Sequence, residues 1–332
     1  MDLKKIKYSI LDLAYIAQGN SIYKTLKHSL DLAIHAEKWG YERFWLAEHH
    51  NMVNIASSAT AVLVGYIAGG TQKIRVGSGG VMLPNHSSLV VAEQFGTLET
   101  LYPGRIDLGI GRAPGTDAQT ARALGRNPHI INAQFPHQIS ELQTYFSKEN
   151  RKEGVRAIPG EGLEIPIYIL GSSTDSAWLA AQLGLPYAFA GHFAPDHMAE
   201  AFNIYREHYK PSQDFPHPYV IAAINVVAAP TDEEADYLAT TLFQAFLNLI
   251  RNDRKPSLPP VEDMDALWSP IEAMQVRRML SSSLIGGEST IEKKLQHFLS
   301  VCPIDEIMVV SHIYDHQERL RSYEIFKNMI SR

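Results

Sequence analysis

The sequence alternates throughout between short runs of apolar or β-branched residues and longer segments with helical periodicity. Eight runs have the length and composition of β-strands. They cover residues 8–13, 43–47, 74–80, 105–110, 165–170, 187–190, 219–228 and 306–310. Between them, apolar residues recur every three or four positions, as Leu26, Leu30 and Ala33 do. Several strands are almost continuously apolar, which is typical of parallel strands buried on both faces.

Eight strands alternating with helices predict an α/β fold, a closed (β/α)8 TIM barrel. Such a barrel needs about 250 residues, and the chain has 332. We expect the surplus in two insertions, residues 111–164 after the fourth strand and residues 229–289 after the seventh, above the end of the barrel that holds active sites. A doubly wound open sheet is the alternative, because strand number does not prove closure. With no long linker, residues 1–332 are expected to form a single domain.

The composition excludes several classes of protein. Lys and Arg total 30 and Asp and Glu total 36, so the net charge of −6 argues against a nucleic-acid partner. No run of about 18 apolar residues predicts a membrane span. The first residues imitate a signal peptide, but Asp12 interrupts their apolar stretch, so we expect a cytoplasmic protein. Cys302 is the only cysteine, which excludes an intramolecular disulfide.

Histidines follow the second predicted strand, in the run Glu48-His49-His50. A metal site is one interpretation, but adjacent residues of an extended chain point to opposite faces, so both imidazoles do not easily reach one ion. We therefore predict no metal. The alternative is that one histidine serves as an acid or base, because imidazole titrates near neutral pH.

Glycines, hydroxyls and an arginine follow the next strands. Gly79-Gly80 indicates either a flat ligand against the backbone or a bulge. Gly111-Arg112 fails the dinucleotide fingerprint, and Arg112 is either an anion ligand or an ion-pair partner. The run from Gly171 to Ser176 precedes a predicted helix, so it indicates an anion site or simple N-capping. Because the fourth and fifth strands are neighbours in a barrel, Arg112 and the run from Gly171 to Ser176 would face the same anion.

Four segments together resemble the bacterial luciferase-like monooxygenase family, of the flavin-dependent alkanal monooxygenase type. They are FWLAEHH at 44–50, VGSGGVMLP at 76–84, PGRIDLGIGR at 103–112 and SSTDSAWLAAQLGLP at 172–186. The resemblance extends over roughly residues 6–330. It implies a (β/α)8 barrel that binds FMN at its carboxyl rim.

The resemblance also implies roles for individual residues. His49 matches the catalytic histidine and Glu48 the carboxylate beside it. Gly79 and Gly80 match a pair joined by a non-proline cis peptide bond under the flavin ring. The expected cofactor-binding residues are Gly79, Gly80, Gly111, Arg112, Leu170, Gly171, Ser172, Ser173, Ser176, Ala190 and Gly191. Luciferases have a reactive cysteine at the position of Gly111, an acidic residue at Ser172 and a tryptophan at Gly191, and these differences argue against light emission.

The implied activity is an FMN-dependent monooxygenase that uses reduced FMN as co-substrate, together with O2, to oxidise a small organic substrate. Electrons would come from a separate flavin reductase or from NAD(P)H. The alternatives are a deazaflavin- or NAD(P)H-dependent reductase on the same fold and a non-catalytic flavin-binding protein.

Two further segments have expected roles. Residues 252–283 are a candidate lid. A helix expected over residues 56–68, which is rich in small residues, is a candidate interface for a homodimer.

Overall fold

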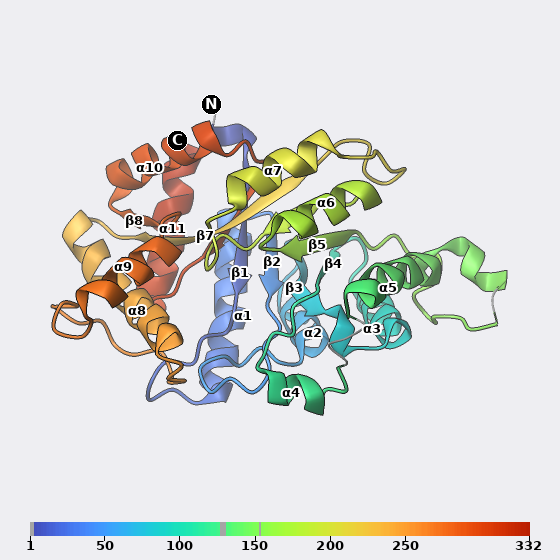
Figure 1. Ribbon diagram of the computed structural model, residues 1–332, viewed down its shortest axis with the longest axis horizontal. Helices are drawn as coiled ribbons and strands as arrows, with labels where there is room; N and C mark the ends of the chain where they lie inside the picture. The colour runs from blue at the N-terminus through green and yellow to red at the C-terminus, as the bar shows by residue number, and fades with distance from the viewer. Residues whose placement is uncertain (1–2, 127–130, 153) are drawn as a thin grey trace.

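The eight predicted strands form a closed parallel barrel in the computed structural model, which describes residues 3–126, 131–152 and 154–332. The barrel strands are β1 (Lys7–Asp12), β2 (Arg43–Leu46), β3 (Arg75–Met82), β4 (Ile106–Gly111), β5 (Ile167–Gly171), β6 (Tyr187–Phe189), β7 (Val220–Ala228) and β9 (Glu306–Val310). Consecutive strands pair in parallel from β1 to β7, then β7 pairs with β9 and β9 with β1. Figure 1 shows β1 to β4 next to one another at the centre of the molecule. This closure excludes the open sheet and confirms the (β/α)8 fold.

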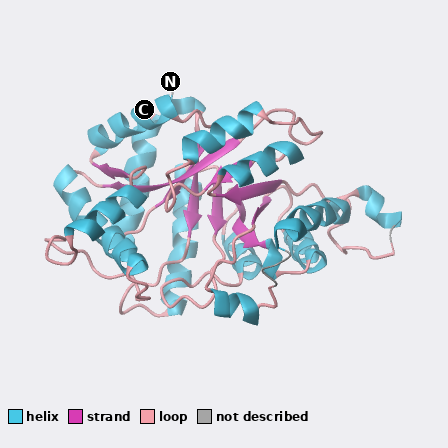
Figure 2. Ribbon diagram, viewed as in Figure 1, coloured by secondary structure: helices cyan, strands magenta, loops and turns pink. Residues whose placement is uncertain are grey.

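Helices surround the barrel (Figure 2). The longer ones are α1 (Ile22–Trp39), α2 (Thr60–Gly70), α3 (Ser88–Leu101), α5 (Ile131–Phe146), α6 (Thr174–Leu183), α7 (Met198–Glu207), α8 (Asp232–Ile250), α10 (Glu288–Val301) and α11 (His316–Ser331). Gly40 and Gly184 end α1 and α6 in the left-handed conformation, which glycine adopts without strain. Among the described residues, none of the helices has the length and apolarity that a membrane span requires.

The helix expected over residues 56–68 begins later, at Thr60. The residues before it are held by the end of β1 instead. The backbone N–H of Ala56 donates to the carbonyl of Ala14, and the Ser57 hydroxyl donates to the carbonyl of Leu13. These contacts occupy the first predicted turn, so the helix forms only beyond them.

The chain after β4 forms α4 (Ala118–Ala123), α5 and the 3-10 helix η3 (Lys148–Lys152). Because α5 packs against α3, it is an ordinary outer helix of the barrel, and the surplus consists of α4 and the flanking loops. α4 lies beside the end of β2, where Asn51 donates to the Thr120 hydroxyl at 2.9 Å. Residues 127–130 and 153 of the predicted insertion lie outside the described residues.

The insertion after β7 is a packed body rather than a long loop. It contains α8, α9 (Pro270–Met279) and the short strand β8 (Leu284–Gly286), which was not predicted and pairs with the end of β7. Side chains of α8 and α9 form an apolar cluster around Phe246 and Trp268, separate from the barrel core. The predicted lid segment therefore includes the helix α9, which packs with α8 around an apolar cluster of their own.

The barrel interior has an apolar layer above a layer of ion pairs. Leu11, Trp45 and Met308 belong to the apolar layer. Below it, at the amino ends of the strands, the buried guanidinium of Arg43 lies 2.7 Å from Asp107 and 2.9 Å from Glu306. A second guanidinium, Arg75, lies 2.6 Å from Asp107. Tyr219 donates to Glu306 at 2.7 Å, so both carboxylates are bonded more than once.

Candidate active site at the carboxyl end of the barrel

The carboxyl ends of the parallel strands bring the predicted site residues to one rim. Strand register places Gly111 opposite Leu170 and Leu170 opposite Ala188. On the other side of β4, Gly111 pairs with Met82 at the end of β3. The rim therefore collects the ends of β3, β4, β5 and β6 in order, which is where barrel enzymes place their active sites.

The buried carboxylate of Glu48 is the centre of a hydrogen-bonded cluster. It accepts from His50 at 2.9 Å, from His86 at 2.9 and 3.0 Å, and from the backbone N–H of Met82 at 3.2 Å. Burial raises the pKa of Glu48, but the hydrogen bonds from His50 and His86 outweigh it and lower the pKa to about 2. The carboxylate therefore stays ionised and fastens the loop after β3 to the end of β2.

The same cluster has the donor atoms of a metal site. One atom each of Glu48, His50 and His86 lies within 4.8 Å of the others. Hydrogen bonds to the carboxylate already account for this geometry, because both imidazoles bond to Glu48. His86 was not a predicted site residue. It follows a strand at the rim, as His49 and His50 do, and that position was the available signal.

His49 has a different environment from its neighbour His50. Its backbone N–H donates to the Ser57 carbonyl at 2.9 Å. Its buried Nδ1 atom has no hydrogen-bond partner among the described residues. Burial lowers the pKa of His49 to about 4, against the opposing effect of the Glu48 charge. The lowered pKa means that the imidazole is neutral at pH 7.

His192, at the end of β6, repeats this pattern and was not predicted. Its buried Nδ1 also lacks a partner among the residues described. Burial, and secondly the nearby His49, lower the pKa of His192 to about 3. Its backbone is held firmly, because Asn225 donates to the His192 carbonyl at 2.6 Å and Ser282 donates to the Gly191 carbonyl at 2.9 Å. Two neutral imidazoles thus lie near each other at the rim.

Gly79 and Gly80 lie inside β3, and the peptide bond between them is cis, as the resemblance implied. The pairing of β3 with β4 changes register between Ser78 and Val81, so the bulge interpretation is also confirmed. A Cβ on Gly79 would lie 2.6 Å from Leu11, and one on Gly80 would lie 2.6 Å from the Gly109 carbonyl. Close packing therefore requires glycine at both positions.

Two arginines lie close together past the end of β4. Arg126 donates to the backbone carbonyl of Arg112, and to the side-chain carbonyl of Asn85 at 3.0 Å. Both of these acceptors of Arg126 are uncharged. Burial, and then the positive charge of Arg112, lower the pKa of Arg126. Arg126 was not predicted, because no local motif marks it and its proximity to Arg112 is set by the fold.

The loop between β5 and α6 has the predicted N-capping geometry. Ser173 is the N-cap of α6, and Ser176 completes a capping box with it. The Ser176 hydroxyl donates to the Ser173 carbonyl at 2.7 Å and lies 2.9 Å from the Tyr187 hydroxyl. A Cβ on Gly171 would lie 2.1 Å from the Ser176 oxygen, which requires glycine there. Helix capping thus engages Ser173 and Ser176, and the N-terminus of α6 lies beside the β4 rim.

The remaining predicted residues line the rim between β5 and β6. Leu170 is partly buried against the apolar interior layer. The backbone N–H of Ala190 donates to the Gly171 carbonyl at 2.9 Å, which joins the two strand ends. A Cβ on Gly191 would lie 2.8 Å from the Met198 sulfur. The strand ends on this side are therefore joined through their backbone, and the Met198 side chain packs closely against Gly191.

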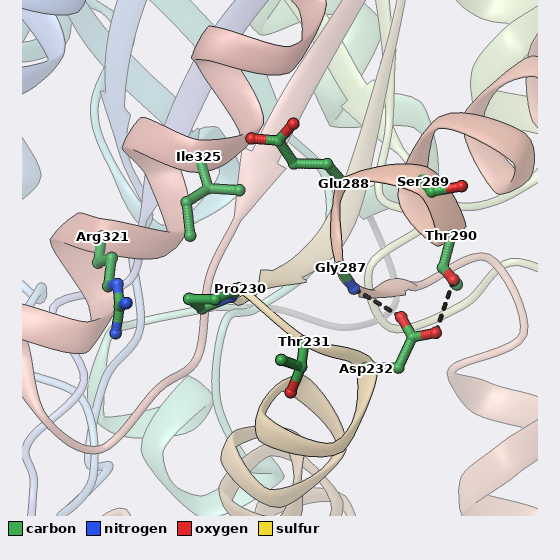
Figure 3. A pocket seen from close by; sticks show the side chains of 9 residues that line it. All are labelled: Pro230, Thr231, Asp232, Gly287, Glu288, Ser289, Thr290, Arg321 and Ile325. Atoms are coloured by element: carbon green, nitrogen blue, oxygen red, sulfur yellow. Dashed lines mark hydrogen bonds between the residues drawn. The ribbon is translucent and has the colours of Figure 1, made fainter.

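A wider surface cavity, of about 590 Å3, lies away from these residues, where α8, α10 and α11 meet (Figure 3). Asp232 accepts from the backbone N–H of Gly287 at 2.7 Å and from the Thr290 hydroxyl at 2.8 Å. These bonds cap the start of α10. The polar groups of this cavity therefore serve helix capping, and its lining includes none of the predicted site residues.

The fold and the rim define an enzyme of the (β/α)8 barrel class, with its chemistry at the carboxyl ends of the strands. More specifically, the chain belongs to the luciferase-like monooxygenase family, whose model matches residues 6–297. It is a flavin-dependent oxidoreductase, as the sequence motifs predicted.

Curated relatives match over nearly their whole length. A luciferase-like monooxygenase of Escherichia coli K12 is 51% identical, over 97% of this chain and 96% of the relative. The N-acetyl-S-alkylcysteine monooxygenase of Bacillus subtilis is 33% identical, over 98% of each chain.

Solved structures share the same fold. The crystal structure of apo-MsnO8 superposes with a TM-score of 0.88 at 32% identity, covering 98% of each chain. The FMN complex of the oxygenating constituent of 3,6-diketocamphane monooxygenase from Pseudomonas putida superposes with a TM-score of 0.75 at 18% identity, covering 98% of this chain and 97% of that one.

Proposed function

We propose that this protein is an FMN-dependent monooxygenase that uses reduced FMN and O2 to oxidise a small, uncharged organic substrate. One oxygen atom of O2 enters the product, and the other leaves as water with the two electrons and two protons of the reduced flavin. Membership of the luciferase-like monooxygenase family supports the reaction class. The residues at the rim support the choice of a flavin that carries a phosphate.

The observation that carries the proposal is the pair of guanidiniums at Arg112 and Arg126. Two like charges near each other repel, and the positive charge of Arg112 lowers the pKa of Arg126. A phosphate group beside these two guanidiniums would accept charge-assisted hydrogen bonds from them, and the adjacent N-terminus of α6 would add favourable backbone N–H groups. Arg112, Arg126, Ser172 and the backbone from Gly171 would therefore hold the FMN phosphate.

The flavin ring would lie over the glycine backbone at the centre of the rim. Gly79 and Gly80 provide a surface without side chains. Leu170, Ala190 and Gly191 would contact the ring from the β5 and β6 side. Bound FMN supplies the electron transfer to O2, which amino-acid side chains do not perform.

His49 would act as the base, with Nδ1, which has no hydrogen-bond partner in the described part of the chain, as the proton-accepting atom. Because its pKa is lowered to about 4, the ring is neutral at pH 7 and free to accept a proton. Glu48 makes its side-chain bonds to His50 and His86. Its role would be to shape the pocket wall beside His49.

Isotope labelling tests the reaction directly. The holoenzyme, with photoreduced FMN, is mixed with 18O2 and a panel of small ketones, aldehydes and thioethers, and the products are analysed by mass spectrometry. We expect one 18O atom in the product of at least one compound. Hydride transfer without O2, from a deazaflavin or NAD(P)H, would instead support the reductase alternative. Tight FMN binding with no turnover of any kind would support a non-catalytic flavin-binding protein.

The electron source and the oligomer are separate proposals. NAD(P)H consumption by the protein alone would identify a direct donor, whereas dependence on an added flavin reductase would identify a two-component system.

A homodimer is proposed through α2, where Val62 is 70% exposed on a helix rich in small residues. Sedimentation should give about twice the 37.1 kDa chain mass, and a single monomeric species would reject the dimer.

A further inference from the structure

Three side chains that can ligate a metal ion meet at the rim from two segments of the chain. Glu48 and His50 follow β2, and His86 follows the 3-10 helix η2 (Leu83–Asn85) after β3. One ligand atom of each side chain lies within 4.8 Å of the other two. In the part of the chain that the structure describes, these are the only three acidic, cysteine or histidine side chains so placed.

The adjacent imidazoles of His49 and His50 do not easily reach one ion, but the fold supplies a different pair. Glu48 and His50 are two positions apart, so an extended chain directs their side chains to the same side. Their hydrogen bond at 2.9 Å agrees with this direction. His86 then brings the second imidazole to within 2.9 Å of the same carboxylate. The set of ligands therefore contains His86 in place of His49.

The backbone of each of these histidines is fixed by another segment of the chain. The backbone N–H of His50 donates to the Gly115 carbonyl at 3.0 Å, and the His50 carbonyl accepts from the Thr116 hydroxyl at 2.8 Å. The His86 carbonyl accepts from the side chain of Gln138, on α5, at 3.1 Å. Both imidazoles are therefore held near the carboxylate before an ion binds, which lowers the cost of ordering the site.

The Glu48 carboxylate is ionised and oriented, as a metal ligand must be. The backbone N–H of Met82 donates to its Oε2 atom at 3.2 Å. The side-chain nitrogen of Asn85 lies 3.4 Å from its Oε1 atom, and the side-chain oxygen of Asn85 accepts from Arg126 at 3.0 Å. Asn85 therefore supports the carboxylate from behind, and such supporting groups strengthen a metal site.

The cluster is open to solvent on its histidine side. The side chains of His86 and His50 are 32% and 17% exposed, whereas that of Glu48 is 2% exposed. Ligand atoms around a tetrahedral Zn2+ lie about 3.3–3.5 Å apart, because Zn–N and Zn–O bonds are about 2.0–2.2 Å long. Each imidazole nitrogen already lies 2.9 Å from Oε1 of Glu48. Small movements of the side chains would therefore suffice to surround an ion.

The donor atoms determine which ion the cluster favours. Two imidazole nitrogens and one carboxylate oxygen suit Zn2+, whereas Mg2+ and Ca2+ prefer oxygen ligands. Both Nε2 atoms now carry a hydrogen, because an ionised carboxylate only accepts hydrogen bonds. When an ion replaces these bonds, the hydrogen of each ring would move to Nδ1. The rings would stay neutral, and Glu48 would supply one negative charge to the ion.

We propose that Glu48, His50 and His86 form a binding site for a divalent transition-metal ion such as Zn2+, with the fourth ligand position left to water. The ion would take the place of the hydrogen bonds that now fasten the loop after β3 to the end of β2. It would be bound by the residues on either side of His49 in the sequence. The inference goes beyond the proposed function and does not rest on it.

Calorimetric titration tests the site without turnover. The full-length protein, dialysed against a chelator, is titrated with ZnCl2 and, separately, with MgCl2. We expect one Zn2+ to bind per chain and Mg2+ to bind at least about tenfold more weakly. Loss of a group behind a ligand typically costs about 10–100-fold in affinity, so His86→Gln, which removes a ligand, should weaken Zn2+ binding at least about tenfold. His137→Gln removes an exposed imidazole 3.5 Å from Glu141, and as the matched control it should leave the Kd unchanged.

Urea unfolding gives a second readout, because an ion that binds only the folded protein stabilises it. Zn2+ should raise the urea midpoint of the wild type and of His137→Gln, and should leave that of His86→Gln almost unchanged. Circular dichroism reports whether each variant is folded, and His50→Gln replaces His86→Gln if that variant does not fold.

Equal Zn2+ affinity of the wild type and the ligand variant would overturn the site, as would the absence of saturable Zn2+ binding. Neither measurement involves the flavin reaction. Failure of 18O incorporation with intact Zn2+ binding would therefore overturn the monooxygenase activity and leave the metal site standing.

Discussion

The two ends of the barrel interior differ in how their charged and polar groups are paired. At the amino end, two guanidiniums and two carboxylates alternate, and Arg43 bridges Asp107 and Glu306. At the carboxyl rim, Arg126 adjoins Arg112 and donates to uncharged acceptors, and His49 and His192 each bury a nitrogen that has no partner among the described residues. The charges at the amino end are paired with opposite charges, whereas two imidazole nitrogens at the rim have no partner among the described residues.

The largest expected effect is at the amino end. Arg43→Met removes the cation shared by two buried carboxylates and should lower the free energy of unfolding by about 3–5 kcal/mol. Urea denaturation measures this change. Lys7→Met, in the exposed pair with Glu42, is the control and should change stability by less than about 1 kcal/mol. A similar small change for Arg43→Met would contradict the assigned role of the network.

At the rim, loss of a cation should affect binding more than folding. Arg126→Met should weaken FMN binding about 10–100-fold, because a charge-assisted hydrogen bond contributes about 1.5–3 kcal/mol. Fluorescence titration of FMN measures the Kd. Arg122→Met, four positions earlier and exposed, is the matched control. If both variants bind FMN like the wild type, Arg126 does not belong to the phosphate site.

His192→Phe should change the free energy of unfolding in the opposite direction from Arg43→Met, or leave it unchanged. It removes a buried nitrogen that bonds to no residue in the described ranges, and it should leave stability unchanged or raise it by about 1 kcal/mol. His312→Phe is the comparison, since that imidazole bonds to Ser257 and its loss should destabilise the protein. Urea unfolding of both variants decides the point. A clear loss of stability in His192→Phe would mean that the ring has a structural partner.

A further effect is a pH dependence from the same imidazoles. The pKa values of His49 and His192 are lowered to about 4 and 3 in the folded protein, below the usual 6.5. The unfolded chain therefore binds protons first, so stability is full above about pH 6.5 and falls as the pH drops toward 4. Unfolding measured at pH 7, 6 and 5 should show a shallower decline for His192→Phe. Parallel curves for the two proteins would rule out this contribution.

The strand pattern predicted the barrel well, because buried parallel strands are apolar in sequence wherever they lie. The short strand β8 was not predicted, since three residues carry little periodicity. The helix expected over residues 56–68 was placed too early, because contacts with β1 hold Ala56 and Ser57. Such long-range contacts leave no local signal.

Sequence alone therefore determined the eight strands of the barrel, the family and the rim positions of His49, Gly79, Gly80 and Arg112, whereas closure of the barrel came from the structure. Those features depend on local periodicity and on motifs that are contiguous in the chain. Only the tertiary structure decided which side chains meet across the rim. Glu48 with His86, Arg112 with Arg126 and His49 with His192 are each brought together by the way the segments after the strands fold over the rim. The physical reason is that burial and charge proximity depend on the folded geometry, which a linear pattern does not contain.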